Sequence, residues 1–180
     1  MTVRQPAVAG TFYPRAPAPL LRLVDSLLEA ATIGEPLPAA PKALVVPHAG
    51  YVYSGPIAAR AYAAVRPWAR QLRRVVLLGP AHRVPVRGLA LSGADRFATP
   101  LGEVAVDREL AQRLCTLPQV QVNDLAHQWE HSLEVQLPFL QRVLGSFSLL
   151  PLAVGDATPA EVGAVLGMAW GGAETLIDQQ

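Results

Sequence analysis

The sequence predicts an α/β fold, with a mostly parallel central sheet that is covered by helices on both faces. Two short apolar runs, Ala43–Val46 and Val75–Leu78, each end at a turn that contains proline or glycine. Strands that are apolar throughout are typical of parallel sheets buried between helices. Because a helical stretch separates the two runs, strand, helix and strand from Ala43 to Leu78 are expected to form one right-handed crossover unit.

Length, composition and charge limit the class of protein. A chain of 180 residues can form one domain with a sizeable core, and 51% hydrophobic residues are typical of a globular protein. A net charge of +1 would not steer nucleic acid or acidic membranes to the chain, and no apolar run approaches the roughly 18 residues of a membrane span. The single cysteine, Cys115, excludes an intrachain disulfide framework, so we expect a cytoplasmic protein in which this thiol is inert and buried.

The first third of the chain is predicted to hold an irregular arm and two helices. Prolines and a glycine prevent regular structure in Val3–Pro14. Pro19–Thr32 has an amphipathic helical pattern. Its apolar face consists of Leu20, Val24, Leu27 and Ala31. The next helix is expected to begin at Ser54-Gly55-Pro56, since serine is a good N-cap and proline is tolerated in a first turn. Its predicted core face consists of Ile57, Ala61 and Val65.

The rest of the chain is predicted to alternate strands with helices. The expected strands are Val75–Leu78, Gly88–Ser92, Ser148–Val154 and Glu174–Ile177, with Phe97–Val106 as a loop or short hairpin. The expected helices run from Asp107 to Leu114, along the apolar positions Leu133 to Leu144, and from the capping box Thr158–Glu161 to about Trp170. Pro138 predicts a kink or a late start in the second of these helices. Pro151 predicts that its strand is interrupted or lies at a sheet edge.

Two histidines occupy matched positions after the first two apolar runs. His48 follows Pro47, and His82 follows the turn after Leu78. Ligands of open α/β sheets bind beyond the carboxyl ends of the strands, so the two imidazoles should emerge at the same end if the strands are neighbours. Imidazole suits iron, zinc and copper, which makes the pair a candidate metal site. The alternative is that each ring is bonded to backbone in a turn.

Tyr51 and Tyr53 flank this position and are candidate ligand-binding residues. Tyrosine offers an apolar body and a polar tip, so both residues either line the crevice or pack against it.

The segment His127–His131 matches the H-x-x-E-H pattern of zinc peptidases. In that pattern two histidines on one helix bind zinc and the glutamate, here Glu130, is the base. A third ligand would have to come from the short remainder of the chain. The alternative is a polar loop that leads into a helix, with Glu130 near its positive end.

Four segments resemble the Memo family, whose bacterial and archaeal members are called AmmeMemoRadiSam system protein B. They are Pro6–Pro14, Pro47–Gly55, Leu78–His82 and Glu130–Gln141. The resemblance extends from the first residues to about Ile177. It implies a three-layer α/β/α architecture similar to that of class III extradiol dioxygenases, which are non-haem iron enzymes.

The resemblance also implies roles for three histidines. His48 and His82 match the two metal-binding histidines of the family, with iron as the expected ion and copper or zinc as alternatives. His131 matches a position near the site and is a candidate catalytic acid or base. The further ligands of the family, a cysteine and an Asp and a His after the last predicted strand, have no counterpart here, and Cys115 does not match that cysteine.

From this resemblance we expect residues 1–180 to form one Memo-like domain that is truncated at its C-terminus. Two histidines without a third protein ligand should hold metal weakly. An uncovered sheet or core should favour self-association. The preferred hypothesis is a metal-site crevice of the dioxygenase type that takes a small molecule or peptide, with catalysis left open. The alternatives are a non-enzymatic peptide or small-ligand binding module and an H-x-x-E-H zinc peptidase.

Overall fold

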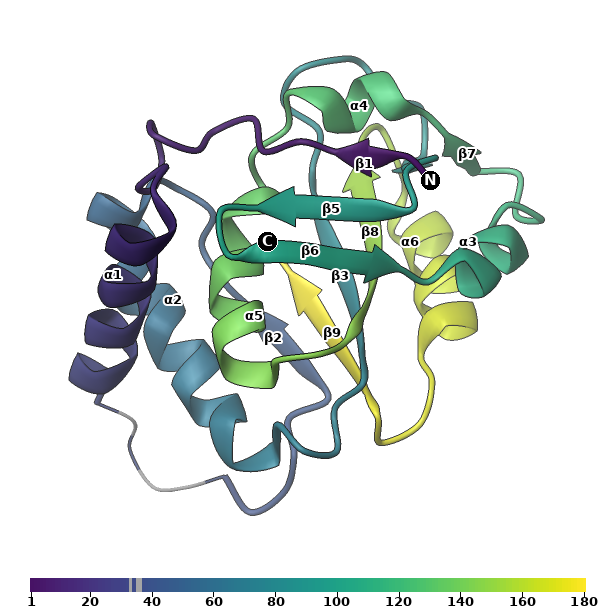
Figure 1. Ribbon diagram of the computed structural model, residues 1–180. Coiled ribbons are helices and arrows are strands. Elements are labelled where there is room, and N and C mark those ends of the chain that lie inside the picture. Colours follow the sequence, from purple (N-terminus) through teal and green to yellow (C-terminus); the bar gives the residue numbers. More distant parts are fainter. Residues whose placement is uncertain (33, 35–36) are drawn as a thin grey trace.

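The computed structural model describes residues 1–32, 34 and 37–180. Within these residues, nine strands form one sheet (Figure 1). They are β1 (Val3–Arg4), β2 (Ala43–Val45), β3 (Arg74–Pro80), β4 (Leu89–Leu91), β5 (Arg96–Thr99), β6 (Gly102–Val106), β7 (Val120–Val122), β8 (Ser148–Val154) and β9 (Thr175–Gln179). The order is β1-β5-β6-β8-β3-β9-β2, and β4 and β7 join the sheet beside β8. Among the strands of the described residues, only the pairs β5–β6 and β4–β8 are antiparallel.

Helices cover both faces of the sheet, as predicted. They are α1 (Pro17–Ala30), α2 (Tyr51–Val65), α3 (Arg108–Leu114), α4 (Asp124–Gln128), α5 (Leu137–Leu144) and α6 (Pro159–Ala169), with 3₁₀ turns η1 (Arg66–Trp68) and η2 (Glu134–Gln136). Figure 1 shows α1, α2 and α5 on one side of the strands and α3 and α6 on the other. Along β3, Val75 and Leu77 pack with the first group, and Val76 and Leu78 pack with the second. This alternation confirms the three-layer α/β/α architecture.

Several local predictions are confirmed. Phe97–Val106 contains the β5–β6 hairpin, and the Asp107 carboxylate accepts the Leu110 N–H at the start of α3. Thr158 and Glu161 form a reciprocal capping box at the start of α6. The α5 helix starts late, with Pro138 in its first turn where no helical hydrogen bond is lost. The sequence pattern did not indicate β7 or α4, because each is short.

The first predicted strand is not buried. β2 pairs with β9 along one edge, and Val45 is 80% exposed. The apolar residues Ala43–Val46 therefore did not predict burial correctly, since only Val46, directly after the strand, is buried. β2 and β3 are also not direct neighbours, because β9 lies between them.

Pro151 does not place β8 at an edge or interrupt it, which corrects the prediction. β8 pairs with β3 along its whole length, from Ser148 to Val154. On its other side, β6 pairs with residues 148–149 and β4 pairs with residues 152–154. Pro151 falls at the change from one partner to the other, so its missing N–H costs no ladder hydrogen bond.

The α2 helix begins three residues earlier than predicted. Its first N–H, that of Tyr51, donates to the Phe12 carbonyl in the N-terminal arm at 2.8 Å. A backbone group from a distant segment therefore replaces the predicted Ser54 cap. The core face is also rotated, because Ile57 is 55% exposed while Ala58 and Tyr62 are buried.

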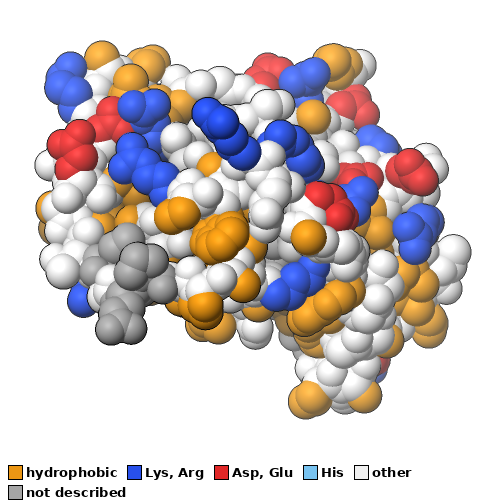
Figure 2. All heavy atoms as spheres, turned by 90° about the horizontal axis from the view of Figure 1, so that it is seen from below, with side chains coloured by type: hydrophobic (Ala, Val, Ile, Leu, Met, Phe, Trp, Pro, Cys, Tyr) orange, Lys and Arg blue, Asp and Glu red, His pale blue; other side chains and the backbone are white. Residues whose placement is uncertain are grey.

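Other surface features are consistent with the composition. Of the described residues, no helix is long and apolar enough to cross a membrane. On the face shown in Figure 2, Lys and Arg side chains are interspersed with Asp and Glu, in keeping with the net charge of +1. Cys115 is exposed, which corrects the prediction of a buried thiol; it follows the last turn of α3.

Candidate metal centre

Three histidines meet at the end of the sheet where β2 and β3 have their carboxyl ends. His48 lies between β2 and α2, His82 follows β3, and His131 lies between α4 and η2. One ligand atom from each residue lies within 4.8 Å of the other two. The ring centroids are separated by 5.3 Å for His48–His82, 4.6 Å for His82–His131 and 5.8 Å for His48–His131. The structure therefore brings the two histidines predicted at the strand ends together with His131, which the family resemblance placed near them.

The three-histidine cluster adjoins an open crevice with a volume of ≈ 790 Å³. His48 and His131 line it directly. Its other walls are mostly apolar and come from the arm, the end of β2, the start of α2 and the last residue: Phe12, Val45, Val46, Pro47, Ala49, Gly50, Tyr53 and Gln180. Pockets of this size, with few polar groups among apolar walls, are typical of sites for small molecules.

The two candidate tyrosines have different surroundings. Tyr53 is 82% exposed and lines the crevice, so it is available to a ligand. Tyr51 is buried between Tyr13 and Phe139, and its hydroxyl donates to the Val135 carbonyl at 2.7 Å. Tyr51 therefore packs beneath the site and does not contact the crevice, which corrects its predicted role as a ligand-binding residue.

Glu130 holds the cluster together, although it is not one of the three converging ligands. Its carboxylate, only 1% exposed, accepts the backbone N–H of His82 at 2.6 Å and lies 2.9 Å from His82 Nδ1. It also accepts the backbone N–H groups of His131 and Ser132, at 2.8 and 2.9 Å. One buried carboxylate thus connects the segment after β3 to the segment that carries His131.

Four donors keep Glu130 ionised. Burial raises the pKa of its carboxyl group, but the hydrogen bonds from His82, Ser132 and His131 outweigh burial and bring the pKa to about 2. An ionised carboxylate only accepts, so the hydrogen between it and His82 belongs to Nδ1 of the imidazole. His82 is therefore the tautomer whose Nε2 carries a lone pair, as in the carboxylate–histidine pairs of metal sites.

The environment also favours neutral rings at His48 and His131. Burial lowers the pKa of both imidazoles, and the neighbouring His82 lowers them further, while Glu130 acts in the opposite direction. Neutral imidazole is the form that binds metal.

Two ring nitrogens support the fit of a cation. The Nδ1 atoms of His48 and His131 are buried and have no hydrogen-bond partner among the described residues. His131 Nδ1 lies 3.2 Å from a Glu130 oxygen, but without the geometry of a hydrogen bond. Unpaired buried polar atoms require an explanation. The Nδ1 atom of His127, outside the cluster, is unpaired as well within the described part of the chain. At the cluster a coordinated ion provides an explanation, because three histidines on three segments suit iron, zinc or copper.

The fourth histidine lies outside the cluster. His127 is 1% exposed, its Nε2 lies 2.9 Å from the Ala90 carbonyl, and its ring packs edge-on against Phe97. Burial lowers its pKa to about 4, so the ring is neutral. α4 ends at Gln128, before His131, so His127 and His131 do not share a helix. The zinc peptidase hypothesis is therefore wrong. Residues 129–133 form the polar loop of the alternative, whereas His127 and Gln128 belong to α4.

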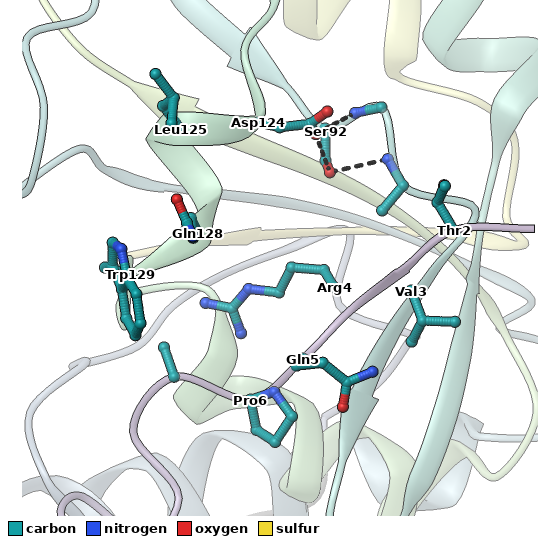
Figure 3. A pocket seen from close by; sticks show the side chains of 13 residues that line it. Thr2, Val3, Arg4, Gln5, Pro6, Ser92, Asp124, Leu125, Gln128 and Trp129 are labelled. Carbon is teal, nitrogen blue, oxygen red and sulfur yellow. Dashed lines mark hydrogen bonds between the residues drawn. The ribbon is translucent and has the colours of Figure 1, made fainter.

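A buried ion pair attaches the N-terminal arm to the same segment. Arg4 is paired with Glu134, which is fully buried, and also donates to the carbonyls of His127 and Glu130. Figure 3 shows Arg4 between the arm and α4, beside a second cavity of ≈ 580 Å³ that Trp129 also lines. The arm in turn places the Phe12 ring 4.8 Å from the His131 ring.

The chain belongs to the Memo family. The family model described as Memo-like protein matches residues 4–171, which include all three histidines of the cluster. A MEMO1 family protein of Aquifex aeolicus is 43% identical over 155 residues, which cover 86% of this chain and 55% of that relative. A MEMO1 family protein of Methanosarcina barkeri is 44% identical over 168 residues, covering 91% and 60%. The chain thus spans less than two thirds of the length of these relatives.

Within this Memo family member, the sequence pattern did not indicate the roles of Glu130 and Glu134. The glutamate next to His131 in the motif Glu130–Gln141 was the available signal for the first. No local signal pointed to the second, because its partner Arg4 lies 130 residues away in the sequence.

Proposed function

We propose that His48, His82 and His131 bind one divalent metal ion and that the adjoining crevice holds a small molecule beside it. The observation that carries the proposal is the convergence of three histidine ligand atoms within 4.8 Å. Three protein ligands are usual in catalytic zinc sites and leave positions open for water or substrate. The ion we expect is iron, with copper or zinc as alternatives.

The residues around the cluster support this proposal. Glu130 presents the lone pair of His82, and burial keeps His48 and His131 neutral. When bound, the ion would act as a Lewis acid toward an oxygen atom of the small molecule. The apolar walls of the crevice would exclude water from the body of the small molecule, and Tyr53 would contact this molecule at the rim. We include a dioxygenase-like reaction in the proposal on the basis of the family resemblance alone.

Metal analysis of the purified protein tests the proposal. We expect close to one equivalent of metal per chain, and its loss in His48→Ala, His82→Ala and His131→Ala. His127→Gln is the matched control, because this histidine is buried outside the cluster and glutamine keeps an N–H donor near the Ala90 carbonyl. Full metal content in the triple alanine variant would disprove the site.

A second candidate is a binding module without catalysis. The exposure of Val45 and Tyr53 at the crevice favours it, since an apolar rim can hold a small molecule or a peptide without metal. Ligand binding that persists in the triple alanine variant but is lost in Tyr53→Ala would select this candidate.

We further propose a cytoplasmic location, based on the single cysteine, and self-association along the exposed edge of β2, which sedimentation at several protein concentrations would detect.

A further inference from the structure

A second group of polar side chains lies beneath the crevice and has no role in the proposed metal site. Its centre is Asp178 in β9, which is fully buried and faces α2. Its Oδ2 lies 2.6 Å from the Tyr62 hydroxyl, and its Oδ1 accepts from Gln180 Nε2 at 3.0 Å. The Tyr62 hydroxyl also lies 2.8 Å from Gln136 Oε1.

The orientation of the Gln136 side chain follows from the backbone. Its terminal amide lies 3.0 Å from the Pro47 carbonyl, directly before His48. A carbonyl oxygen only accepts hydrogen bonds, so the NH₂ group of Gln136 must face Pro47. The amide oxygen of Gln136 must then face Tyr62, and it too only accepts.

Counting the hydrogen atoms along this row of hydrogen bonds indicates the protonation state of Asp178. Tyr62 has one hydroxyl hydrogen, and among the described residues it is the one donor within reach of Gln136 Oε1. The contact of 2.6 Å between Tyr62 and Asp178 then has no hydrogen unless the carboxyl group supplies one. An ionised Asp178 would place two acceptors in contact, or would take the hydrogen away from Gln136.

We propose that Asp178 is a neutral carboxylic acid in the folded protein, and that its proton leaves the Tyr62 hydroxyl free to hold Gln136 against the carbonyl that precedes His48. The hydrogen bonds run in one direction, from Asp178 to Tyr62, from Tyr62 to Gln136, and from Gln136 to Pro47. Loss of the Asp178 proton redirects the Tyr62 hydroxyl to the carboxylate and breaks its hydrogen bond to Gln136. Among the described residues, the NH₂ group of Gln136 then keeps only the Pro47 carbonyl and the Gln180 side-chain oxygen as partners. These three hydrogen bonds therefore form a pH-sensitive brace, which supports the turn that carries His48.

The surroundings of Asp178 agree with a neutral acid. Burial raises its pKa to about 7; the hydrogen bonds that Tyr62 and Gln180 would donate to the ionised carboxylate lower the pKa, but burial outweighs them. Neither partner is charged, and the residues beside Asp178 on the neighbouring strands, Leu77 in β3 and Leu44 in β2, are aliphatic. Tyr62, in α2, is the one titratable group that contacts it among the described residues, and burial raises the pKa of that phenol well above its ordinary value.

An NMR titration of metal-free protein with labelled Asp and Gln side chains tests the proposal directly. The Asp178 carboxyl carbon, assigned by its absence in Asp178→Asn, should still report a protonated acid at about pH 5.5, above the ordinary aspartate pKa of about 3.9. The Gln136 side-chain amide should change with pH in step with it. In Asp178→Asn, which keeps an N–H donor toward Tyr62, the Gln136 amide should not respond to pH. An ionised Asp178 at about pH 5.5 would overturn the proposal.

A pair of tyrosine variants tests the hydrogen bond between Tyr62 and Gln136. Tyr62→Phe removes the hydroxyl that holds Gln136 and should speed hydrogen exchange at the Gln136 side-chain amide. Tyr51→Phe is the control, since this buried tyrosine on the same helix also packs on Phe139 but donates to a different acceptor. Equal exchange in the two variants would contradict the proposed brace.

The consequence for metal binding rests on the proposed function of His48. The Asp178→Asn variant should bind metal severalfold more tightly than wild type at about pH 8.5 and equally at about pH 5.5, since groups that orient a ligand residue typically change affinity by about tenfold or more. Equal metal affinity of Asp178→Asn and wild type at both pH values would show that the brace does not affect metal binding by His48. If wild type binds no metal, the proposed function fails, whereas the NMR result on Asp178 stands on its own.

Discussion

The carboxylate of Glu130 accepts two hydrogen bonds from His82, one from its backbone N–H at 2.6 Å and one from its ring Nδ1–H at 2.9 Å. Together these bonds determine both the position of the residue and the rotation of its ring. Since the same carboxylate also accepts from His131 and Ser132, a single side chain sets the relation between two histidines of the cluster.

Replacing Glu130 by glutamine should weaken metal binding more than it weakens the fold. Glutamine has the same shape, but its NH₂ group would face a donor of His82, so the ring would lose its orientation. We expect metal affinity to fall by about 10- to 100-fold, measured by competition with a chelator. Glu134→Gln serves as the control, because Glu134 is buried on the same segment without contacting a histidine of the cluster. Unchanged affinity in Glu130→Gln would refute this role.

The buried pair of Arg4 and Glu134 should matter mainly for stability. Glu134→Gln would leave the Arg4 guanidinium buried without a counter-charge, at a cost of about 3–5 kcal/mol in the free energy of unfolding. Denaturant titration measures this loss. The surface pair of Arg96 and Glu103 is the comparison, with atoms 3.8 Å apart; Glu103→Gln should change stability by less than about 1 kcal/mol. Similar losses in the two variants would count against the buried pair.

Gly79 in β3 should tolerate no side chain. A Cβ atom there would lie 2.6 Å from Ser132 Oγ and 2.9 Å from Leu133 Cδ2, so the segment after His131 would have to shift. We expect Gly79→Ala to lower the midpoint of thermal unfolding and to weaken metal binding. Gly167→Ala, in α6, has no neighbour within 4 Å of the new Cβ and should be neutral or stabilising by up to about 1 kcal/mol. The prediction fails if both variants bind metal as wild type does.

Stability should depend on pH through Asp178. Its pKa is raised to about 7 in the folded protein, against about 3.9 in an unfolded chain. The folded state thus holds a proton that the unfolded state has released between these values. The contribution of the group to stability is complete below about pH 4 and is lost as the pH rises through 7.

The difference between Asp178→Asn and wild type isolates this effect. The variant should gain stability relative to wild type on the order of 4 kcal/mol from pH 4 to pH 7, because asparagine does not titrate. The wild-type curve alone is a poor measure, since the pKa of His127 is lowered to about 4 and gives the opposite slope between pH 4 and 6.5. Asp156→Asn, at an exposed carboxyl, provides the reference. Parallel curves for Asp178→Asn and wild type would contradict the prediction.

Much of the fold follows from patterns that are local in the sequence. The apolar run Val75–Leu78, the capping box at Thr158 and the spacing of Leu133 to Leu144 each depend on residues within one or two turns or along one strand. These patterns were sufficient to predict the layers and the end of the sheet at which His48 and His82 emerge. The exposed position of β2 was not predictable in this way, because it depends on which strand pairs with it.

The sequence by itself therefore determined the α/β class and the family resemblance, and the resemblance pointed to His48, His82 and His131. Only the tertiary structure brought His131 to the other two, placed Glu130 against His82 and buried Asp178 beside Tyr62. The reason is physical: hydrophobic periodicity repeats within a segment and is visible in it, whereas a hydrogen bond between residues 48 or 116 positions apart exists only once the sheet has packed and excluded water.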